Sequence, residues 1–231
     1  MTKRINFENT LNTRDLGGYP IEGGGYTVYN RFWRSDAPRH LCDSEIDVFL
    51  SQNITTVVDL RGTGEIVRQP CFLSDVKDFS YFNIPLDGEI RVPEREEDVP
   101  DQYMDMIRNK SAMAQIMKVF AETASGVLFH CAAGKDRTGV VAVLLLLLAR
   151  VPREDIIADY QVSGTYIEKR IAQSKLSNPA LPPHTGLSRP EYIKNFLPLF
   201  FELYPTVEDY MRELGLSSEQ ISSIRDKLIS P

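Results

Sequence analysis

The sequence predicts an α/β fold in which a central, mostly parallel sheet is flanked by helices, with a helical C-terminal part. The β-branched run from Ile54 to Leu60 is typical of a strand buried on both faces. The apolar run 126–129 leads into a polar loop and then a long apolar helix, the order of a strand–loop–helix unit. Beyond residue 150 several segments have helix-period apolar residues. The apolar faces of those later helices must be buried against the sheet, so we expect residues 1–231 to form one domain.

The first half of the chain is expected to begin with strands and turns and then to alternate helices with strands. Gly17-Gly18 and Gly23-Gly24-Gly25 mark two turns. Ser44 is the expected N-cap of the first helix. The expected elements are short strands at 26–29 and 31–34, a helix to about residue 51, a strand at 54–60, a short helix at 62–67, a strand at 79–84 and a helix around 104–123.

The second half is expected to be helical around one central element. Gly126 to Phe129 forms the strand that leads into the polar loop, and Thr138 to Arg150 is apolar on all sides, which predicts a central buried helix. A segment rich in proline and polar residues, 174–188, is expected to be a loop. The further helices are expected at 153–172, 190–203, 207–214 and 217–229.

Composition and charge limit the classes of function. The chain has 231 residues and a formal net charge of −6. A mildly acidic protein is not expected to bind nucleic acid or a membrane surface in general. An anionic substrate would therefore need a local basic pocket.

The cysteines and the N-terminus suggest a cytoplasmic protein. Cys42, Cys71 and Cys131 give no disulfide framework, and chemistry at Cys131 would require a reducing compartment. No apolar core of a signal peptide follows the N-terminal charges, although export by another route is not readable from the sequence. The run Val140 to Ala149 is too short to span a bilayer, so we expect no stable membrane insertion. The sequence does not fix the oligomeric state.

The most informative stretch is the loop between the apolar strand and the apolar helix. Cys131 and Arg137 bracket it, with small residues, a glycine and two charges between them. A loop that wraps its backbone N–H groups around an anion needs this composition, and the following helix adds the positive end of its dipole. We therefore expect an anion in the loop and Cys131 aimed at it. The expected anion-binding residues are Ala132, Ala133, Gly134, Lys135 and Arg137.

The same field favours the thiolate form of Cys131, because a cysteine at a helix N-terminus beside a cation is a competent nucleophile near neutral pH. The planar guanidinium of Arg137 suits two phosphate oxygens. Thr138 could donate a hydrogen bond to the sulfur when it leaves. These groups predict attack of the cysteine on a phosphate ester through a cysteinyl-phosphate intermediate.

Three other interpretations of the loop are weaker. A lone cysteine is usually a small buried hydrophobic residue, but here the His, Gly, Arg and Thr around it match the signature loop of the family that the chain resembles, as described in the next paragraph. A nucleotide-binding P-loop needs glycine in place of Phe129 and Ser or Thr in place of Asp136. A rhodanese-like sulfur carrier also uses an anion loop, but the Cys-to-Arg spacing and Thr138 favour phosphate.

The stretch His130-Cys131-x-x-Gly134-x-x-Arg137-Thr138-Gly139 resembles the signature loop of cysteine-based protein tyrosine phosphatases. The variant Gly134-Lys135-Asp136-Arg137 resembles a bacterial branch that acts on phosphotyrosine and, in several members, on phosphoserine, phosphothreonine and phosphoinositides. The resemblance covers nearly the whole chain and implies a tyrosine phosphatase-like fold and a phosphorylated protein or phosphoinositide as substrate. The other similar motifs are Asn12 to Gly18, Arg34 to Asp36, Asp59 to Arg61 with Glu65, Tyr204 to Tyr210 and Leu214 to Ser217.

The leaving group of the phosphate ester, an alkoxide or a phenoxide, needs a proton from a general acid. Two aspartates are candidates for this role. Asp136 lies within the loop, and the bacterial branch that the loop resembles carries there an aspartate implicated as the acid. Asp87 follows a strand and a proline, where other tyrosine phosphatases keep a mobile acid loop. Either could instead be structural, Asp136 by capping the helix and Asp87 by ending the strand. The motif match favours Asp136.

The remaining charged residues of the loop region have two interpretations each. Lys135 either balances Asp136 at the surface or, as the resemblance suggests, contacts extra phosphates of an inositol ring. His130 is expected to be a hydrogen-bond partner behind the loop rather than an acid. No spacing of His40 or His184 with cysteines or carboxylates suggests a metal site, and the predicted chemistry uses no metal or other cofactor.

The polar residues of the N-terminal motifs are expected to support the loop. Arg14 and Asp15 could line the pocket, but a buried ion pair that braces the loop is the favoured interpretation. The same applies to Arg34, Asp36, Asp59, Arg61 and Glu65.

Residues 91–102 are dense in charge and contain two prolines. They are either a solvated surface loop or part of a mobile lid or substrate-selecting segment, expected around 88–110.

Together the features of the sequence predict a metal-independent phosphatase of relaxed specificity. The alternatives are a phosphoinositide phosphatase, which only Lys135 favours, and a phosphate-binding module without turnover, which would need a loss at Cys131, Arg137 or both aspartates.

Overall fold

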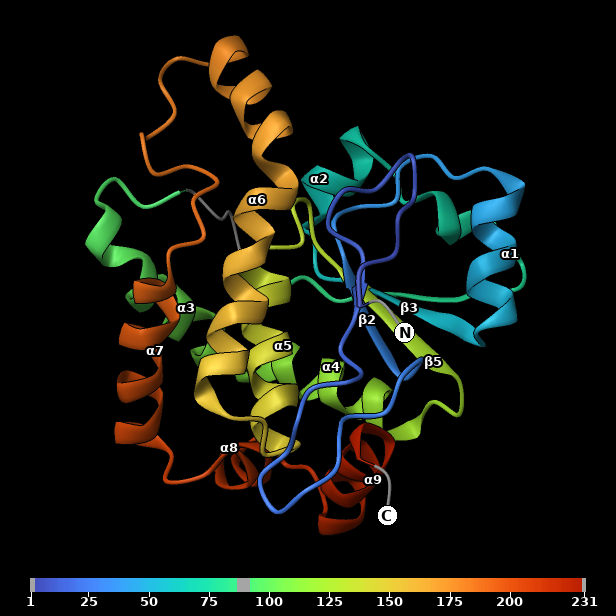
Figure 1. Cartoon of the computed structure of the whole chain (residues 1–231), viewed down its shortest axis with the longest axis vertical. Helices are drawn as coiled ribbons and strands as arrows, with labels where there is room; N and C mark the ends of the chain where they lie inside the picture. Colours follow the sequence, from blue (N-terminus) through green and yellow to red (C-terminus); the bar gives the residue numbers. More distant parts are fainter. Residues whose placement is uncertain (1–2, 87–91, 230–231) are drawn as a thin grey trace.

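The structure is a computed structural model that describes residues 3–86 and 92–229. Within these residues a five-stranded sheet with the order β1-β2-β5-β3-β4 crosses the molecule (Figure 1). Neighbours among β2, β5, β3 and β4 pair in parallel, while β1 pairs antiparallel at one edge. The predicted α/β class with a mostly parallel sheet is confirmed. The strands are β1 (Arg14–Asp15), β2 (Phe32–Ser35), β3 (Ile54–Asp59), β4 (Ser80–Asn83) and β5 (Gly126–His130).

Helices cover both faces of the sheet. Figure 1 shows α1 on one side and α4, α5 and α6 on the other. In the part of the chain that is described, no helix combines the length and the apolar character needed to cross a bilayer. The helices are α1 (Asp43–Ser51), α2 (Thr63–Arg68), α3 (Val99–Arg108), α4 (Lys110–Glu122), α5 (Asp136–Leu148), α6 (Arg153–Ser177), α7 (Pro190–Leu203), α8 (Val207–Glu213) and α9 (Ser218–Leu228), with 3-10 turns η1 (Phe72–Asp75) and η2 (Glu96–Asp98).

The inner strands are apolar at successive positions because they are buried on both faces. Val57 and Leu128 pack into a small core with α1, whereas Val58 and Phe129 pack into a large core with the helices of the opposite face. Successive side chains of a strand point to opposite faces, so a strand between two helical layers needs apolar residues at both.

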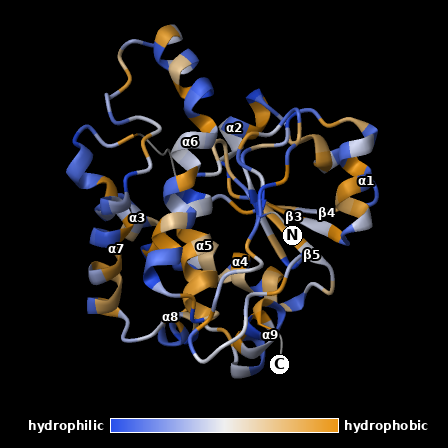
Figure 2. Ribbon diagram, in the orientation of Figure 1, coloured by the Kyte–Doolittle hydropathy of each residue, from blue (hydrophilic) through white to orange (hydrophobic). Residues whose placement is uncertain are grey.

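From Val140 onward the central helix α5 is apolar around its whole circumference, and Figure 2 draws this part mostly in orange. Nearly all its residues are buried, as the sequence predicts. The helix begins at Asp136 rather than at Thr138. An acidic residue in the first turn interacts favourably with the positive end of the helix dipole, which explains the earlier start.

Several predicted boundaries are wrong for identifiable reasons. Residues 26–29 do not form a strand, because only isolated bridges occur there, from Tyr26 to Pro20 and from Thr27 to Ile229. The helix expected around 104–123 is two helices, since the side chain of Asn109 accepts a hydrogen bond from the backbone N–H of Ala112 and caps α4. The first helix has Cys42 rather than Ser44 at its N-cap, and α6 extends five residues further than expected, to Ser177.

Candidate active site

The polar loop leaves the sheet between two neighbouring strand ends. Ser35 of β2 and Asp59 of β3 both pair with His130, the last residue of β5. The carboxyl ends of parallel strands meet at one edge of a sheet, where α/β proteins place their sites. Cys131 therefore emerges between the ends of β2 and β3, and it is buried there.

The shape of the loop is set by a glycine and by bonds to its carbonyl oxygens. Gly134 has a φ of +67°, and a Cβ atom there would lie 2.5 Å from the carbonyl carbon of Ser35, so a larger residue does not fit. Asn12 Nδ2 donates to the carbonyl oxygens of Ala133 and Gly134, both at 3.0 Å, and Arg34 Nη2 donates to that of Gly134 at 2.8 Å. Carbonyls held by the surrounding scaffold leave the N–H groups of the loop for an anion.

Arg137 is held by a carboxylate from another element. Its two terminal nitrogens donate to the carboxylate oxygens of Glu65 at 2.5 and 2.9 Å. Burial alone would raise the pKa of Glu65, but the hydrogen bonds and charge of Arg137 lower it, so Glu65 stays ionised. This two-point contact fixes the plane of the guanidinium at the start of α5.

A buried ion network lies beneath the loop. Asp159 of α6 accepts hydrogen bonds from Arg14 Nε at 2.8 Å, from Arg34 and from the hydroxyl of Tyr19 at 2.9 Å. Burial would raise the pKa of Asp159, but the two arginines hold it far below its usual range. The predicted ion pair of Arg14 with Asp15 is wrong, because the Asp15 carboxylate instead accepts hydrogen bonds from backbone N–H groups and from the indole of Trp33.

We expect Asp159→Asn to lower the free energy of unfolding by about 3–5 kcal/mol, because it leaves two buried arginines without a countercharge. The measurement is urea unfolding at neutral pH. Asp105→Asn, in an exposed ion pair with Arg108, is the control and should cost at most about 1 kcal/mol. Because the folded-state pKa is depressed, the stabilisation by Asp159 exists above the unfolded-state pKa near about 4 and is lost as the pH falls below it. Equal losses in both variants would contradict the buried network.

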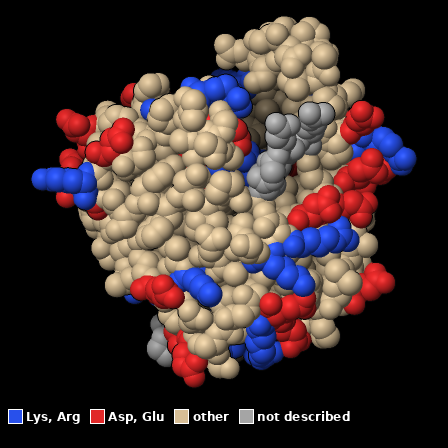
Figure 3. All heavy atoms as spheres, turned by 180° about the vertical axis from the view of Figure 1, so that it is seen from behind, with Lys and Arg blue, Asp and Glu red and all other residues tan. Residues whose placement is uncertain are grey.

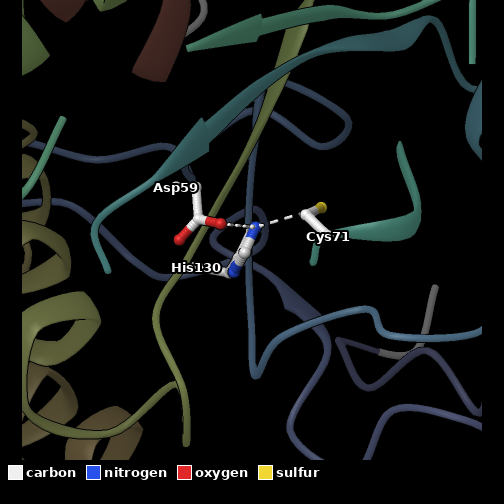
Figure 4. Close-up of side chains that lie close together, drawn as sticks. All are labelled: Asp59, Cys71 and His130. Carbon is white, nitrogen blue, oxygen red and sulfur yellow. Dashed lines mark hydrogen bonds and ion pairs between the residues drawn. The ribbon is translucent and has the colours of Figure 1, made fainter. Parts of the chain in front are cut away.

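His130 lies behind the loop, beside Asp59 and Cys71 (Figure 4). Its Nε2 is 3.6 Å from Asp59 Oδ2 and 3.6 Å from Cys71 Sγ. Burial lowers the pKa of His130, so the imidazole is neutral. Each of these three side chains has an atom of a kind that can bind a metal ion. However, the Asp59 carboxylate already pairs with Arg61 at 2.6 Å and accepts from Tyr81 at 2.8 Å, an arrangement that suits a brace rather than a metal site.

Asp136 does not pair with Arg137, its neighbour in the sequence. Arg137 turns away to Glu65, and Asp136 Oδ1 instead accepts a hydrogen bond from the Tyr103 hydroxyl at 2.6 Å. The hydroxyls of Tyr103 and Tyr160 are also 2.6 Å apart, so Tyr160 donates to Tyr103. Burial raises the pKa of both tyrosines well above 10, which keeps them protonated as donors. Asp136 does not cap the helix with its side chain, because the N-cap position belongs to Lys135.

Neither interpretation of Lys135 describes its position fully. The residue is buried rather than at the surface. Its Nζ lies 3.0 Å from Asp136 Oδ1 and donates to the carbonyl oxygen of Leu187 at 2.6 Å. Lys135 thereby ties the polar loop after β5 to the loop between α6 and α7.

Cys131, Asp136 and Arg137 line one pocket of about 190 Å³. Its walls include apolar residues of α3 and α6, namely Val99, Ile167 and Ile171. The bracing residues Arg14, Asp15, Arg34, Asp59, Arg61 and His130 do not line it. Thr138 follows Arg137 in the sequence. Its hydroxyl is buried and has no hydrogen-bond partner among the described residues. On the face drawn in Figure 3, acidic and basic side chains are interspersed, and basic side chains lie along one side of a hollow in its upper part.

The charged segment before α3 forms part of this pocket. Val92 and Pro93 line it together with Cys131. Further along, the Glu96 carboxylate accepts from the Tyr192 hydroxyl at 2.7 Å and pairs with Arg189 at 2.8 Å, which attaches the segment to α7. The described part of the segment is therefore a wall of the pocket rather than a wholly solvated loop. Asp87 and residues 88–91 lie outside the described residues.

Tyr103, Tyr160 and Asp159 were not predicted as parts of the site. All three lie on helices with ordinary apolar periodicity, and no local motif distinguishes them from core residues. Asn12 lies within a motif that was noted for its family resemblance, but its contact with the loop joins positions more than a hundred residues apart.

Comparisons with known proteins place the chain in a family. A sequence profile described as "Tyrosine phosphatase family" matches residues 5–230. The chain belongs to the tyrosine phosphatase family. This membership confirms the resemblance noted in the sequence and identifies the chain as a phosphatase of the protein tyrosine phosphatase class.

Individual relatives agree with this membership. A tyrosine-protein phosphatase of Nostoc commune is 26% identical over 81% of this chain and 70% of its own length. A putative tyrosine-protein phosphatase of Cupriavidus necator is 32% identical over 68% of this chain and 62% of its own. The triple specificity protein phosphatase PtpB of Mycobacterium tuberculosis is 26% identical over 56% of this chain and 54% of its own. The aligned region thus spans less than two thirds of the latter two proteins.

Proposed function

We propose that this phosphatase hydrolyses phosphate monoesters in two steps, through a phosphate covalently bound to Cys131. The observation that carries the proposal is that Cys131, Asp136 and Arg137 line the same pocket where β5 meets α5. A nucleophile, a proton donor and a bidentate cation within one pocket are what this reaction class requires.

In the first step the phosphate group binds in the loop, with its oxygens on backbone N–H groups and on Arg137. The Cys131 thiolate attacks phosphorus while Asp136 donates its proton to the departing oxygen. Positive charge from Arg137 and from the N-terminus of α5 stabilises the charge on the transferring group. Glu65 contributes by holding the guanidinium in one orientation.

In the second step Asp136 removes a proton from water, which attacks the phosphocysteine and releases inorganic phosphate. The Thr138 hydroxyl, buried and without a described partner, supports this step by donating a hydrogen bond to the leaving sulfur. The hydrogen bond from Tyr103 holds Asp136 in position through both proton transfers. Because the reaction needs Cys131 reduced, we place it in a reducing compartment such as the cytoplasm.

The substrate class that fits best is phosphotyrosine in proteins, with phosphoserine and phosphothreonine as further substrates. Apolar walls favour an aryl group next to the phosphate. The "triple specificity" in the name of the relative PtpB supports a broad range. A phosphoinositide is the second candidate, and the position of Lys135 in the lining of the pocket is the observation that favours it.

A turnover panel tests the proposed function. We expect phosphate release from a phosphotyrosine peptide to exceed that from phosphoserine peptide and from phosphoinositide vesicles, and an acid-quenched reaction to contain phosphate bound to Cys131. Metal chelators should leave turnover unchanged. Absence of the phosphocysteine, or turnover only with phosphoinositides, would overturn the mechanism or the substrate class respectively.

A further inference from the structure

The loop between α6 and α7 brings two polar side chains to the active pocket that the proposed reaction does not use. His184 and Thr185 line the pocket together with Cys131. They are only 6% and 9% exposed. His184 Nε2 and Thr185 Oγ1 are enclosed and have no hydrogen-bond partner among the described residues. Buried polar groups in native proteins are almost always paired, so two groups on a pocket wall that have no partner among the described residues are available to bind a ligand.

The two residues are held at a fixed place relative to the phosphate loop. Lys135 donates to the carbonyl oxygen of Leu187, just after the pair. The backbone N–H of Leu187 donates to the carbonyl oxygen of His184 at 3.0 Å, which closes a turn. Gly186, with a φ of +80°, lies so close to α6 that a Cβ atom there would be 2.4 Å from Ile171. This packing gives the wall the rigidity that discrimination between substrates requires.

The charges of the lining do not favour a second phosphate as that ligand. Among the lining residues that the structure describes, Lys135 already faces Asp136, and Arg137 already faces Glu65. A further phosphate on an inositol ring would need an additional countercharge. The apolar side chains of the lining, by contrast, suit an aromatic ring.

We propose that His184, together with Thr185, hydrogen-bonds the peptide main chain beside a substrate phosphotyrosine. With the phosphate in the loop and the ring between apolar walls, the next polar groups outward are the amide groups that flank the tyrosine Cα. They are present in every peptide, whatever its sequence. An imidazole and a hydroxyl can each donate or accept, so both suit an amide. This inference rests on the proposed function and makes the two residues determinants of peptide over small aryl phosphates.

The test compares two substrates that differ in the main chain alone. Phenyl phosphate carries the phosphate and ring, whereas N-acetyl-phosphotyrosine N-methylamide adds the two amide groups. We expect His184→Phe to raise KM for the capped amino acid about five- to tenfold with kcat unchanged, and to leave both constants for phenyl phosphate within about twofold. Thr185→Val keeps the side-chain shape but removes the hydroxyl, and it should raise the KM for the capped amino acid about threefold. This variant tests the hydrogen bond of Thr185 separately from that of His184.

Two further variants separate binding from structural support. Ser188→Ala removes another buried hydroxyl of the same loop, which has no hydrogen-bond partner in the described part of the chain and does not line this pocket, so it should leave KM and kcat for both substrates unchanged. His184→Gln retains an N–H donor and should recover most of the affinity for the capped amino acid. Equal losses on both substrates, or a loss confined to phosphoinositide vesicles, would overturn the inference. Failure of the unmodified enzyme to hydrolyse phenyl phosphate would instead defeat the proposed function.

Discussion

Cys131→Ser is expected to abolish turnover, by at least about ten-thousandfold, while phosphate or vanadate still binds. A serine hydroxyl at neutral pH is a far weaker nucleophile than a thiolate. The loop shape does not depend on the sulfur, because Gly134, Asn12 and Arg34 set it. Binding should therefore survive the loss of chemistry.

The measurement pairs phosphate release with calorimetric titration of vanadate. Cys42→Ser is the matched control, since Cys42 is an exposed thiol outside the pocket, and it should retain activity. If Cys131→Ser kept more than a trace of turnover, the covalent mechanism would be wrong. If it lost vanadate binding together with turnover, binding of the anion would depend on the sulfur rather than on the loop and Arg137.

The parts of this site that the sequence could predict are those carried by local pattern. The apolar strand, the loop and the helix α5 are contiguous, and strand burial, loop composition and helix periodicity all follow from neighbouring residues. The strand, the loop and the helix therefore lie close to where the sequence predicts them. The same local reasoning failed where a helix of suitable periodicity was interrupted by a single capping residue, Asn109.

The parts that could not be predicted join distant segments. Arg14 pairs with Asp159 rather than with its neighbour Asp15, because folding brings α6 across the end of β1. Lys135 is buried because the α6–α7 loop folds over it, and no local feature of the loop predicts that cover. Arg137 and Asp136 are adjacent in sequence yet face different partners, since consecutive helix residues point in different directions.

That separation of Asp136 from Arg137 leads to the second large expected effect. With Arg137 engaged by Glu65, Asp136 faces the pocket and the Tyr103 hydroxyl, a position suited to proton transfer. Removing a true general acid slows departure of a poor leaving group about a hundred- to ten-thousandfold, whereas a good leaving group departs without a proton. We expect Asp136→Asn to show a loss of this size on phosphoserine peptide and a much smaller one on p-nitrophenyl phosphate.

The pH–rate profile and the second aspartate decide the assignment. The asparagine oxygen can still accept hydrogen bonds from Tyr103 and from Lys135, so the variant should keep the geometry while it loses the transferable proton and the negative charge that faces Lys135. Its profile should lack the basic limb that titration of the acid produces. Asp87→Asn should stay within about tenfold of the unmodified enzyme on both substrates. The reverse pattern would assign the acid to Asp87. Equal losses at both positions, independent of the leaving group, would mean that neither residue donates the proton and that both maintain the shape of the loop.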